Sequence, residues 1–277
     1  KEHHKELADG LIKEALEEAR IKKPNLIAYS AGPGLPPSLL VGMEKAKEYA
    51  RKWKIPVVEV NHCTAHIEIG RLFTKFSDPV MLYVSGGNTQ VIAFENSKYR
   101  VFGETEDIGL GNLFDSFGRA AGIDFPAGPS IEKLAKDGKK YIELPYSVKG
   151  MDVSFTGLQT KLKQMLEKEK LEDICYSLQE TSFAMLVEIA ERAMAHTNKK
   201  ELILTGGVAA NKRLQEMCKV MCKERQAKFK PIPLELAGDN GVMIAWNGIL
   251  AKSLSKKRNL DIYPRWRTDE VDIVWRK

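Results

Sequence analysis

Apolar positions follow two different periods along the first part of the chain. Residues 5–20 carry small or apolar side chains at every fourth position: Leu7, Leu11, Ala15 and Ala19. This spacing predicts an amphipathic helix. Residues 25–30 and 55–60 are instead short continuous apolar runs, which predict buried strands, and a second helix is expected over 38–53. Strands that alternate with helices predict an α/β architecture with parallel strands.

A second pattern begins after residue 71. Residues 79–84 and 89–95 are rich in strand-forming side chains, and a Ser-Gly-Gly-Asn link at 85–88 joins them. Two such runs around a short glycine-containing link predict a β-hairpin. A plain tight turn is a sufficient explanation for this link taken alone.

A related pattern of a strand followed by paired glycines recurs near residue 205. The apolar run at 201–205 ends in Thr205, and Gly206 and Gly207 follow it, where we expect a helix to open. Glycines lack a Cβ atom, so backbone amides can approach phosphate oxygens, and the N-terminus of a helix favours an anion. The two loops together favour a nucleotide-binding cleft.

The region between these loops is predicted to be mainly helical. Helices are expected over 158–170 and 173–196, with a turn-rich strand at 149–157 before them. The longer helix has one apolar stripe, formed by Ile174, Leu178, Thr181, Met185 and Ile189. A last helix is expected over 242–254.

Two histidines lie four positions apart in the stretch 61–71. Side chains at this spacing share one face of a helix, so His62 and His66 can reach a single ion. Asp239 lies where a short loop precedes a predicted helix and is a candidate oxygen ligand. Residues of these types predict a metal site with open positions for water or substrate.

Composition and charge limit the class of protein. The chain has 277 residues with 43% apolar side chains, enough for one large domain or two lobes. Its formal charge of +6 is compatible with an acidic partner such as nucleic acid and also with an ordinary surface. No apolar run is long enough to span a membrane and the first residues, Lys1-Glu2-His3-His4, do not resemble a signal peptide, so we expect a cytoplasmic protein.

The four cysteines do not form a CxxC pair. They are Cys63, Cys175, Cys218 and Cys222. Reduced thiols in the core are favoured over disulfides in a cytosolic chain.

Basic and aromatic residues alternate near the C-terminus, at 256–258, 263–267 and 275–277. This pattern suits neutralisation of a nucleic-acid backbone together with base stacking. It suits docking to a neighbouring protein or domain equally well.

Five motifs together resemble one protein family. They are Asn-His-Cys-Thr-Ala-His-Ile-Glu at 61–68, Tyr-Val-Ser-Gly-Gly-Asn-Thr-Gln-Val-Ile at 83–92, Lys-Gly-Met-Asp-Val-Ser-Phe at 149–155, Gln-Glu-Thr at 179–181 and Asp-Asn-Gly at 239–241. They resemble the universal tRNA threonylcarbamoyladenosine synthases, of which the archaeal and eukaryotic branch is the catalytic subunit of the KEOPS complex. The resemblance covers almost the whole chain.

The resemblance implies the actin/Hsp70/sugar-kinase fold, an α/β fold of two ribonuclease-H-like lobes with nucleotide between them. Lobe I would comprise 1–75 and about 241–277. Lobe II would comprise 76–240, with a helical insertion at about 105–197. Such proteins normally begin with a strand-turn-strand unit that carries a further phosphate loop, and we do not find it here, so the opening strands of one sheet are expected to be missing.

The resemblance also implies a reaction. The threonylcarbamoyl group of threonylcarbamoyl-adenylate would be moved to N6 of the adenosine 3′ of the tRNA anticodon. His62, His66, Tyr83 and Asp239 resemble the ligands of one divalent metal, iron in the first place and zinc as the alternative. Tyr83, Ser85 and Asp239 are the expected catalytic residues.

Further residues are implied in binding the adenylate, ATP or AMP. Tyr83, Val84, Ser85, Gly86 and Gly87 would lie at the phosphate or carbamoyl end. The ribose and adenine would be held by Asp115, Gly128, Glu132, Gly206, Gly207 and Asn211. The commoner role for carboxylates such as Asp115 and Glu132 is to cap a helix or to lie in solvent.

Three other functions are weighed against this one. A zinc peptidase of the HExxH type has a glutamate directly after its first histidine, where this chain has Cys63. An ATP-dependent kinase of the same fold explains the glycine loops but not the histidine pair. A nucleotide-gated scaffold is the alternative without catalysis.

The partners implied by the resemblance are tRNA, a kinase-like KEOPS subunit, a small dimerising subunit and an accessory subunit. In some archaea the kinase-like domain follows on the same chain.

Overall fold

The computed structural model describes residues 2–256 and 259–276, and the chain divides into two compact units. Unit 1 comprises Lys1–Ile69, Glu95–Tyr99 and Asp239–Lys277, and unit 2 comprises Gly70–Phe94 and Arg100–Gly238. Asp239 therefore groups with unit 1, whereas the expected lobe II ran to residue 240. The lobe boundaries stay a prediction. Of the basic C-terminal residues, Lys257, Arg258 and Lys277 lie outside the described part.

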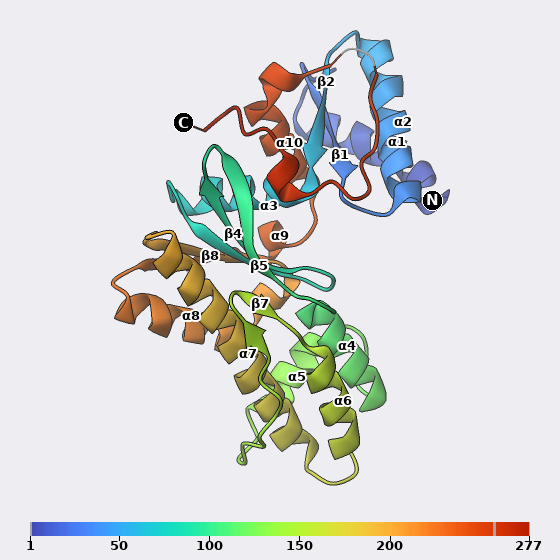
Figure 1. Ribbon diagram of the computed structural model, residues 1–277. Helices are drawn as coiled ribbons and strands as arrows, with labels where there is room; N and C mark the ends of the chain where they lie inside the picture. The colour runs from blue at the N-terminus through green and yellow to red at the C-terminus, as the bar shows by residue number, and fades with distance from the viewer. Residues whose placement is uncertain (1, 257–258, 277) are drawn as a thin grey trace. The chain divides into compact units, whose positions relative to one another are not determined.

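Unit 1 contains a two-stranded parallel sheet with helices packed against it (Figure 1). Its elements are α1 (Glu2–Glu18), β1 (Ile27–Gly32), α2 (Pro36–Trp53), β2 (Val57–Asn61), the first part of α3 (His62–Thr74), α10 (Gly241–Leu250) and the 3₁₀ turns Lys252–Leu254 and Thr268–Glu270. Successive side chains of a strand point to opposite faces. Tyr29 and Ala31 join the core cluster beneath α2, and Ala28 contacts α10, where Gly248 leaves room for the helix. The parallel pairing expected for the first two strands is confirmed.

Unit 2 contains a five-stranded mixed sheet in the order β5-β4-β3-β8-β9 (Figure 1). Its strands are β3 (Val80–Val84), β4 (Thr89–Glu95), β5 (Lys98–Glu104), β8 (Glu201–Thr205) and β9 (Lys228–Pro231). The hairpin predicted around the Ser-Gly-Gly-Asn link is confirmed, because β3 and β4 pair antiparallel with Met81 opposite Ile92. β8 and β9 continue the sheet in parallel beside β3.

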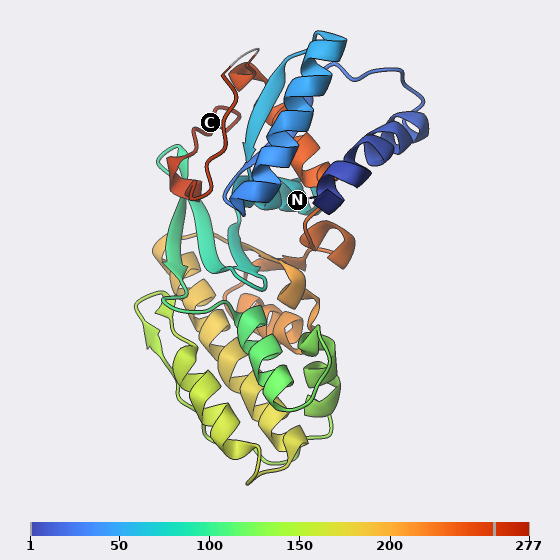
Figure 2. The ribbon, with the colours of Figure 1, turned by 90° about the vertical axis from the view of Figure 1, so that its right-hand side faces the viewer.

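The helices of unit 2 pack around one long central helix (Figure 2). They are α4 (Leu110–Ala120), α5 (Ala127–Ala135), α6 (Thr156–Met165), α7 (Leu171–His196), α8 (Lys212–Glu224) and the single turn α9 (Leu234–Ala237), with a small hairpin of β6 (Val148–Lys149) and β7 (Asp152–Val153). The central helix α7 contacts α5, α6, α8 and β3. All five residues of its predicted stripe are buried, so the expectation that it forms a core is confirmed.

Several predicted helix bounds were wrong. Gly206 and Gly207 do not open a long helix: only a 3₁₀ turn, Gly207–Ala210, follows them, and α8 starts at Lys212 with Asn211 as its N-cap. The helix expected over 158–170 ends at Met165, and the one expected over 242–254 ends at Leu250.

Two strands, β5 and β9, carry charged side chains among the apolar ones and were not predicted. The four cysteines are free and buried, as expected. Within residues 2–256 and 259–276, no helix combines the length and apolarity needed to cross a bilayer.

Candidate metal centre and nucleotide cavity

The histidine pair lies at the point where β2 passes directly into α3. Asn61, the last residue of β2, caps this helix, because its Oδ1 accepts a hydrogen bond from the backbone N of Thr64 at 3.1 Å. Its Nδ2 donates to the backbone O of Trp266 at 3.2 Å. His62 is therefore the first residue of α3, and His66 follows one turn later on the same face.

Asp239 stands at the start of another helix of unit 1. The next residue, Asn240, is the N-cap of α10, and its Oδ1 accepts from the backbone N of Met243 at 2.9 Å. The partial positive charge at a helix N-terminus favours a nearby carboxylate. The local sequence Asp-Asn-Gly thus fixes where the helix begins and leaves the Asp239 side chain outside it.

The three side chains converge through one atom each. His62 Nε2 and His66 Nε2 lie 3.2 Å apart, and each lies 3.2 Å from Asp239 Oδ1. Ligands placed about 2.0–2.1 Å from a tetrahedral ion are roughly 3.3 Å from one another. Two imidazole nitrogens and one carboxylate oxygen at this separation fit a divalent metal, and this is the only such cluster among the residues that the structure describes.

The protonation states of this cluster favour metal binding. Burial lowers the pKa of His66, whose side chain is only 1% exposed, so the ring is held in its neutral form. Hydrogen bonds with His62 and then His66 hold the pKa of Asp239 well below its usual range. A neutral imidazole and an ionised carboxylate are the forms that bind metals. Asp239 is 77% exposed, which leaves one side of the cluster open.

The other expected catalytic residues belong to unit 2. Tyr83 lies on β3 and is buried, and Ser85 begins the link to β4. Ser85 Oγ accepts a hydrogen bond from the backbone N of Asn88 at 3.1 Å and so holds the link in its turn. The roles assigned to Tyr83 as a ligand and to Ser85 in catalysis stay predictions.

A cavity of about 420 Å³ lies within unit 2. It is lined by Gly86, Gly111, Phe114, Asp115, Phe125, Pro126, Gly128, Pro129, Glu132, Gly207, Val208, Ala210, Asn211 and Leu234. Six of the residues expected to bind nucleotide are therefore neighbours around one space, although they come from the two glycine loops, α4, α5 and the start of α8. The other five residues of the expected set do not line it: Tyr83, Val84, Ser85, Gly87 and Gly206.

The polar residues of the cavity also support the fold around it. Asp115 Oδ1 accepts from the backbone N of Ala127 at the start of α5, at 2.9 Å. Glu132 Oε1 accepts from the backbone N of Lys212 at the start of α8, at 2.8 Å. Each carboxylate therefore satisfies one free N–H of a helix end and retains a second oxygen that can accept hydrogen bonds.

Asn211 is the most heavily used of these residues. Its Oδ1 caps α8 by accepting from the backbone N of Arg213 and Leu214, at 2.9 and 3.2 Å. Its Nδ2 donates to Gln179 Oε1 on α7 at 2.5 Å. The side chain is buried and ties the cavity wall to the central helix.

The glycines of the two loops differ in whether the fold itself requires the absence of a side chain. Gly206 has φ +96°, and a Cβ there would lie 2.2 Å from the backbone O of Val84. The fold itself therefore requires it. No atom lies within 4 Å of a Cβ built at Gly87 or Gly207, and both residues are exposed. Their lack of a side chain has no packing reason within the described structure and leaves the backbone open to a ligand.

Sequence reasoning missed the apolar walls of the cavity. Phe125 and Leu234 line it although they are 83% and 59% exposed, and Phe114 forms a buried wall. Gly111 was also missed: a Cβ there would lie 2.7 Å from the Cα of Gly86, so α4 can approach the first loop only with glycine at this position. The one available signal was the Phe-Pro-Ala-Gly-Pro break before α5.

Comparisons with known proteins agree on one family. The profile of the family described as TsaD, tRNA N6-adenosine threonylcarbamoyltransferase, matches residues 1–246. A tRNA N6-adenosine threonylcarbamoyltransferase of Thermococcus sibiricus is 52% identical, over 99% of this chain and 86% of that protein. A probable bifunctional tRNA threonylcarbamoyladenosine biosynthesis protein of Methanocaldococcus jannaschii is 53% identical, over 100% of this chain and 52% of that protein.

Solved structures of much lower identity share the fold. Full-length HypF in its phosphate- and nucleotide-bound form has a TM-score of 0.67 at 13% identity, over 88% of this chain and 49% of that one. HypF of T. kodakarensis has a TM-score of 0.64 at 15% identity, over 85% and 42% of the two chains. The expected α/β fold is thereby confirmed as one that this chain shares with HypF.

Proposed function

This chain belongs to the tRNA N6-adenosine threonylcarbamoyltransferase family, and from that premise we propose a mechanism in which threonylcarbamoyl-adenylate is the donor. The acceptor is N6 of the adenosine 3′ of the tRNA anticodon. The observation that carries the proposal is the convergence of His62, His66 and Asp239 at mutual distances of 3.2 Å. An anhydride donor is already activated, so the enzyme needs orientation and charge stabilisation more than a covalent nucleophile.

His62, His66 and Asp239 hold one divalent metal in this proposal, iron in the first place and zinc as the alternative. When bound, such an ion supplies Lewis acidity that polarises a carbonyl or phosphoryl oxygen. The burial of His66 keeps its ring neutral and its orientation fixed, and Asp239 contributes the negative charge. Imidazole and carboxylate ligands suit both metals. Tyr83, from the separate motif at 83–92, is proposed as a further ligand on the family resemblance alone.

The cavity of unit 2 binds the adenylate part of the donor in this proposal. The free carboxylate oxygens of Asp115 and Glu132 accept hydrogen bonds from ribose hydroxyls, and Phe125, Phe114 and Leu234 offer apolar surface to the base. Gly86 and Gly207 line the cavity and Gly87 follows Gly86 in the chain, and their backbone N–H groups donate to phosphate oxygens. This support is local to the residues that surround the 420 Å³ cavity.

The partners are proposed from the family resemblance and from the relatives. The M. jannaschii relative is described as bifunctional and is about twice as long as this chain. Its extra length supports a kinase-like partner, carried either on the same chain or on a separate one. A small dimerising subunit and an accessory subunit complete the proposed complex. A cytoplasmic location is proposed with it.

Transfer to tRNA by metal-stripped and metal-loaded protein tests this function. The full-length protein with its partner subunits is freed of metal, reloaded with Fe²⁺ or Zn²⁺, and given synthetic threonylcarbamoyl-adenylate and unmodified tRNA. We expect about one metal per chain and transfer only after reloading. Equal transfer by the stripped protein excludes a role for the metal. Phosphorylation of a small molecule, or nucleotide binding without any transfer, favours the kinase or the scaffold instead.

A further inference from the structure

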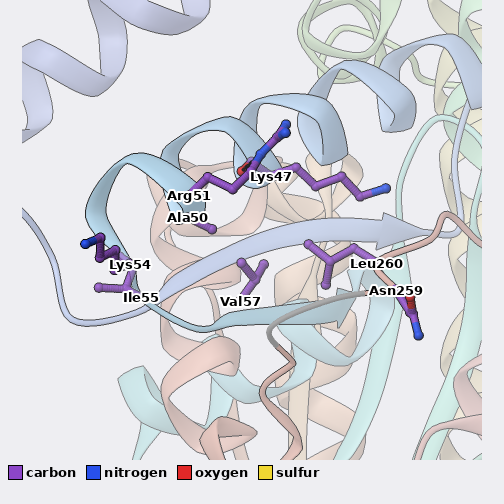
Figure 3. A pocket seen from close by; sticks show the side chains of 8 residues that line it. All are labelled: Lys47, Ala50, Arg51, Lys54, Ile55, Val57, Asn259 and Leu260. Atoms are coloured by element: carbon purple, nitrogen blue, oxygen red, sulfur yellow. Dashed lines mark hydrogen bonds between the residues drawn. The ribbon is translucent and has the colours of Figure 1, made fainter.

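A groove of about 550 Å³ lies within unit 1, apart from the histidine cluster, and its rim is basic. Three cationic side chains line it: Lys47 and Arg51 of α2 and Lys54, the residue directly after this helix (Figure 3). Its remaining lining residues are Ala50, Ile55, Val57, Asn259 and Leu260, with no carboxylate among them. From this arrangement we propose that the groove binds the phosphate backbone of the tRNA substrate. The inference rests on the proposed function.

The cations of α2 fall into two sets with different surroundings. On the side of α1, Lys45 forms ion pairs with Asp9 and Glu48, at 2.9 and 3.1 Å, and Lys52 lies over the ring of Tyr49. The charge of Lys45 is therefore compensated by carboxylates, and the ammonium group of Lys52 contacts an aromatic ring. Lys47, Arg51 and Lys54, in contrast, form no ion pair with any residue in 2–256 or 259–276. Their charge is available to an anion from outside.

The spacing of the three charges suits a polymer better than a single small anion. Lys47 and Arg51 lie on one face of α2, roughly 6 Å apart along its axis at a rise of about 1.5 Å per residue, and Lys54 is the residue directly after the helix. A nucleic-acid backbone presents repeated charges at intervals along its length. Basic side chains in the last turn of a helix also interact with its dipole. That effect accounts for Arg51, but not for Lys47, which lies about one turn earlier, or for Lys54, which lies past the helix end.

The apolar floor of the groove does not contradict a charged ligand. Lysine and arginine lay their aliphatic stems along apolar surface and keep the charged group in water. Figure 3 shows the three basic chains along α2, with Val57 and Leu260 on the strand and the chain segment beside it. Asn259 adds an amide that can donate to a phosphate oxygen. The sequence places two more basic residues, Lys257 and Arg258, directly before it, outside the described part.

The salt dependence of tRNA binding tests this inference. Each phosphate contact contributes roughly 0.7–0.9 to the slope of log K against log salt concentration. The groove variant Lys47→Gln/Arg51→Gln/Lys54→Gln in the full-length protein should therefore lower that slope by about 2–3 and weaken tRNA binding by roughly 10- to 50-fold at low salt. In the transfer assay, KM for tRNA rises and kcat stays unchanged.

The matched control is Lys161→Gln/Lys163→Gln/Lys168→Gln, which removes the same charge from exposed positions of unit 2. It should lower the slope by less than about 1. An equal loss in both variants, or none in the groove variant, overturns the inference, as does loss of a protein partner from the groove variant with tRNA binding intact. The single variant Arg51→Gln, expected to lower the slope by about 1, decides the matter if the triple variant does not fold.

Failure of this inference differs visibly from failure of the proposed function. If the groove variant binds tRNA normally and the wild type transfers the threonylcarbamoyl group, the inference about the groove is wrong and the proposed function stands. If wild type neither binds tRNA nor transfers, the function fails and this inference with it.

Discussion

The metal cluster of unit 1 and the cavity of unit 2 are built in opposite ways. In the cluster, the His62, His66 and Asp239 side chains direct their contacting atoms mainly at one another. In the cavity, Asp115, Glu132 and Asn211 each cap a helix as well. The backbone therefore positions the side chains of the cluster, which cap no helix themselves. The polar side chains of the cavity, in contrast, help to hold the helices that form its wall.

Because of this difference, substitutions in the cluster and in the cavity should affect activity and stability differently. The caps that position the cluster belong to its neighbours, Asn61 and Asn240, so the ligands can be removed without loss of a cap. Removing a polar residue of the cavity leaves a helix end unsatisfied, at a cost of about 0.5–2 kcal/mol. Substitutions in the cluster should therefore change activity alone, and those in the cavity should change activity and stability together.

The largest expected effect is the loss of transfer in His62→Ala. Without one imidazole the metal is not held, and loss of the several kcal/mol of stabilisation that a metal supplies lowers the rate by roughly 10³-fold or more. The side chain is 19% exposed and caps nothing, so Tm of the metal-free variant should match metal-free wild type within about 2 °C. Metal content, single-turnover transfer and thermal melts measure these three quantities.

Retained transfer in this variant contradicts the proposed role of the cluster. A large fall in Tm of the metal-free variant instead contradicts the comparison, because the histidine is then part of the fold. Asp239→Asn is the matched second variant, since it keeps the shape of the side chain and removes its charge.

A smaller but still large effect is expected from the glycines of the two loops beside the cavity. Gly206→Ala forces a Cβ to within 2.2 Å of the Val84 backbone O at φ +96°. We expect a loss of about 3 kcal/mol and a fall in Tm of roughly 6–12 °C. Gly87→Ala meets no atom within 4 Å and should leave Tm unchanged while it weakens AMP binding. Thermal melts of both variants with and without AMP measure these changes. Equal falls in Tm would show that the fold requires both glycines.

The sequence was sufficient for features with a local cause. The i,i+4 spacing of His62 and His66 predicted that both rings lie on one face of a helix, and the two strand-forming runs around the Ser-Gly-Gly-Asn link predicted the antiparallel pairing of β3 and β4. In both, the interacting residues are neighbours in the chain or in a regular element. The apolar stripe of α7 was predictable for the same reason.

Features that depend on distant partners were not predictable. β9 is a short Lys-Phe-Lys-Pro segment whose strand form comes from pairing with β8. The distinction between Gly206 and Gly87 depends on Val84, which is brought there by the sheet. Asp115 and Glu132 were correctly suspected of capping, but the helix starts that they cap follow only from the packing of α4, α5 and α8.

An intermediate loss of stability is expected from substitution of Asn211, which tests whether the polar residues of the cavity hold the fold. Asn211→Ala removes the cap of α8 and leaves Gln179 on α7 without its donor, which together cost about 2 kcal/mol, or roughly 4–8 °C in Tm. Asn211→Asp keeps an oxygen for the cap and loses only the donor, so it should lose about half as much. Chemical denaturation of both variants measures the difference. If Asn211→Ala is as stable as wild type, the cavity is not held by its polar residues.

The smallest loss of stability is expected from substitution of Asp107, a carboxylate of unit 2 that does not line the cavity. Asp107 accepts hydrogen bonds from the backbone N of Phe155 and Thr156, at 2.9 Å each, and one from Ser154 Oγ, and so joins its loop to the start of α6. Partial burial alone would raise its pKa, but these bonds hold the pKa well below its usual range. Because the side chain is exposed, its contribution is small, about 1 kcal/mol.

The pH dependence of stability distinguishes this structural role from a role in binding. A carboxyl group whose pKa is lowered by folding stabilises the protein fully above its unfolded value of 3.8, and that contribution is lost as the pH falls below it. Asp107→Asn should therefore lower Tm by roughly 2–4 °C at pH 7, and the difference from wild type should shrink below about pH 4. AMP affinity should not change. A difference in Tm that is constant from pH 7 to pH 3 contradicts the ionised state of Asp107, and a loss of AMP affinity makes it part of the cavity.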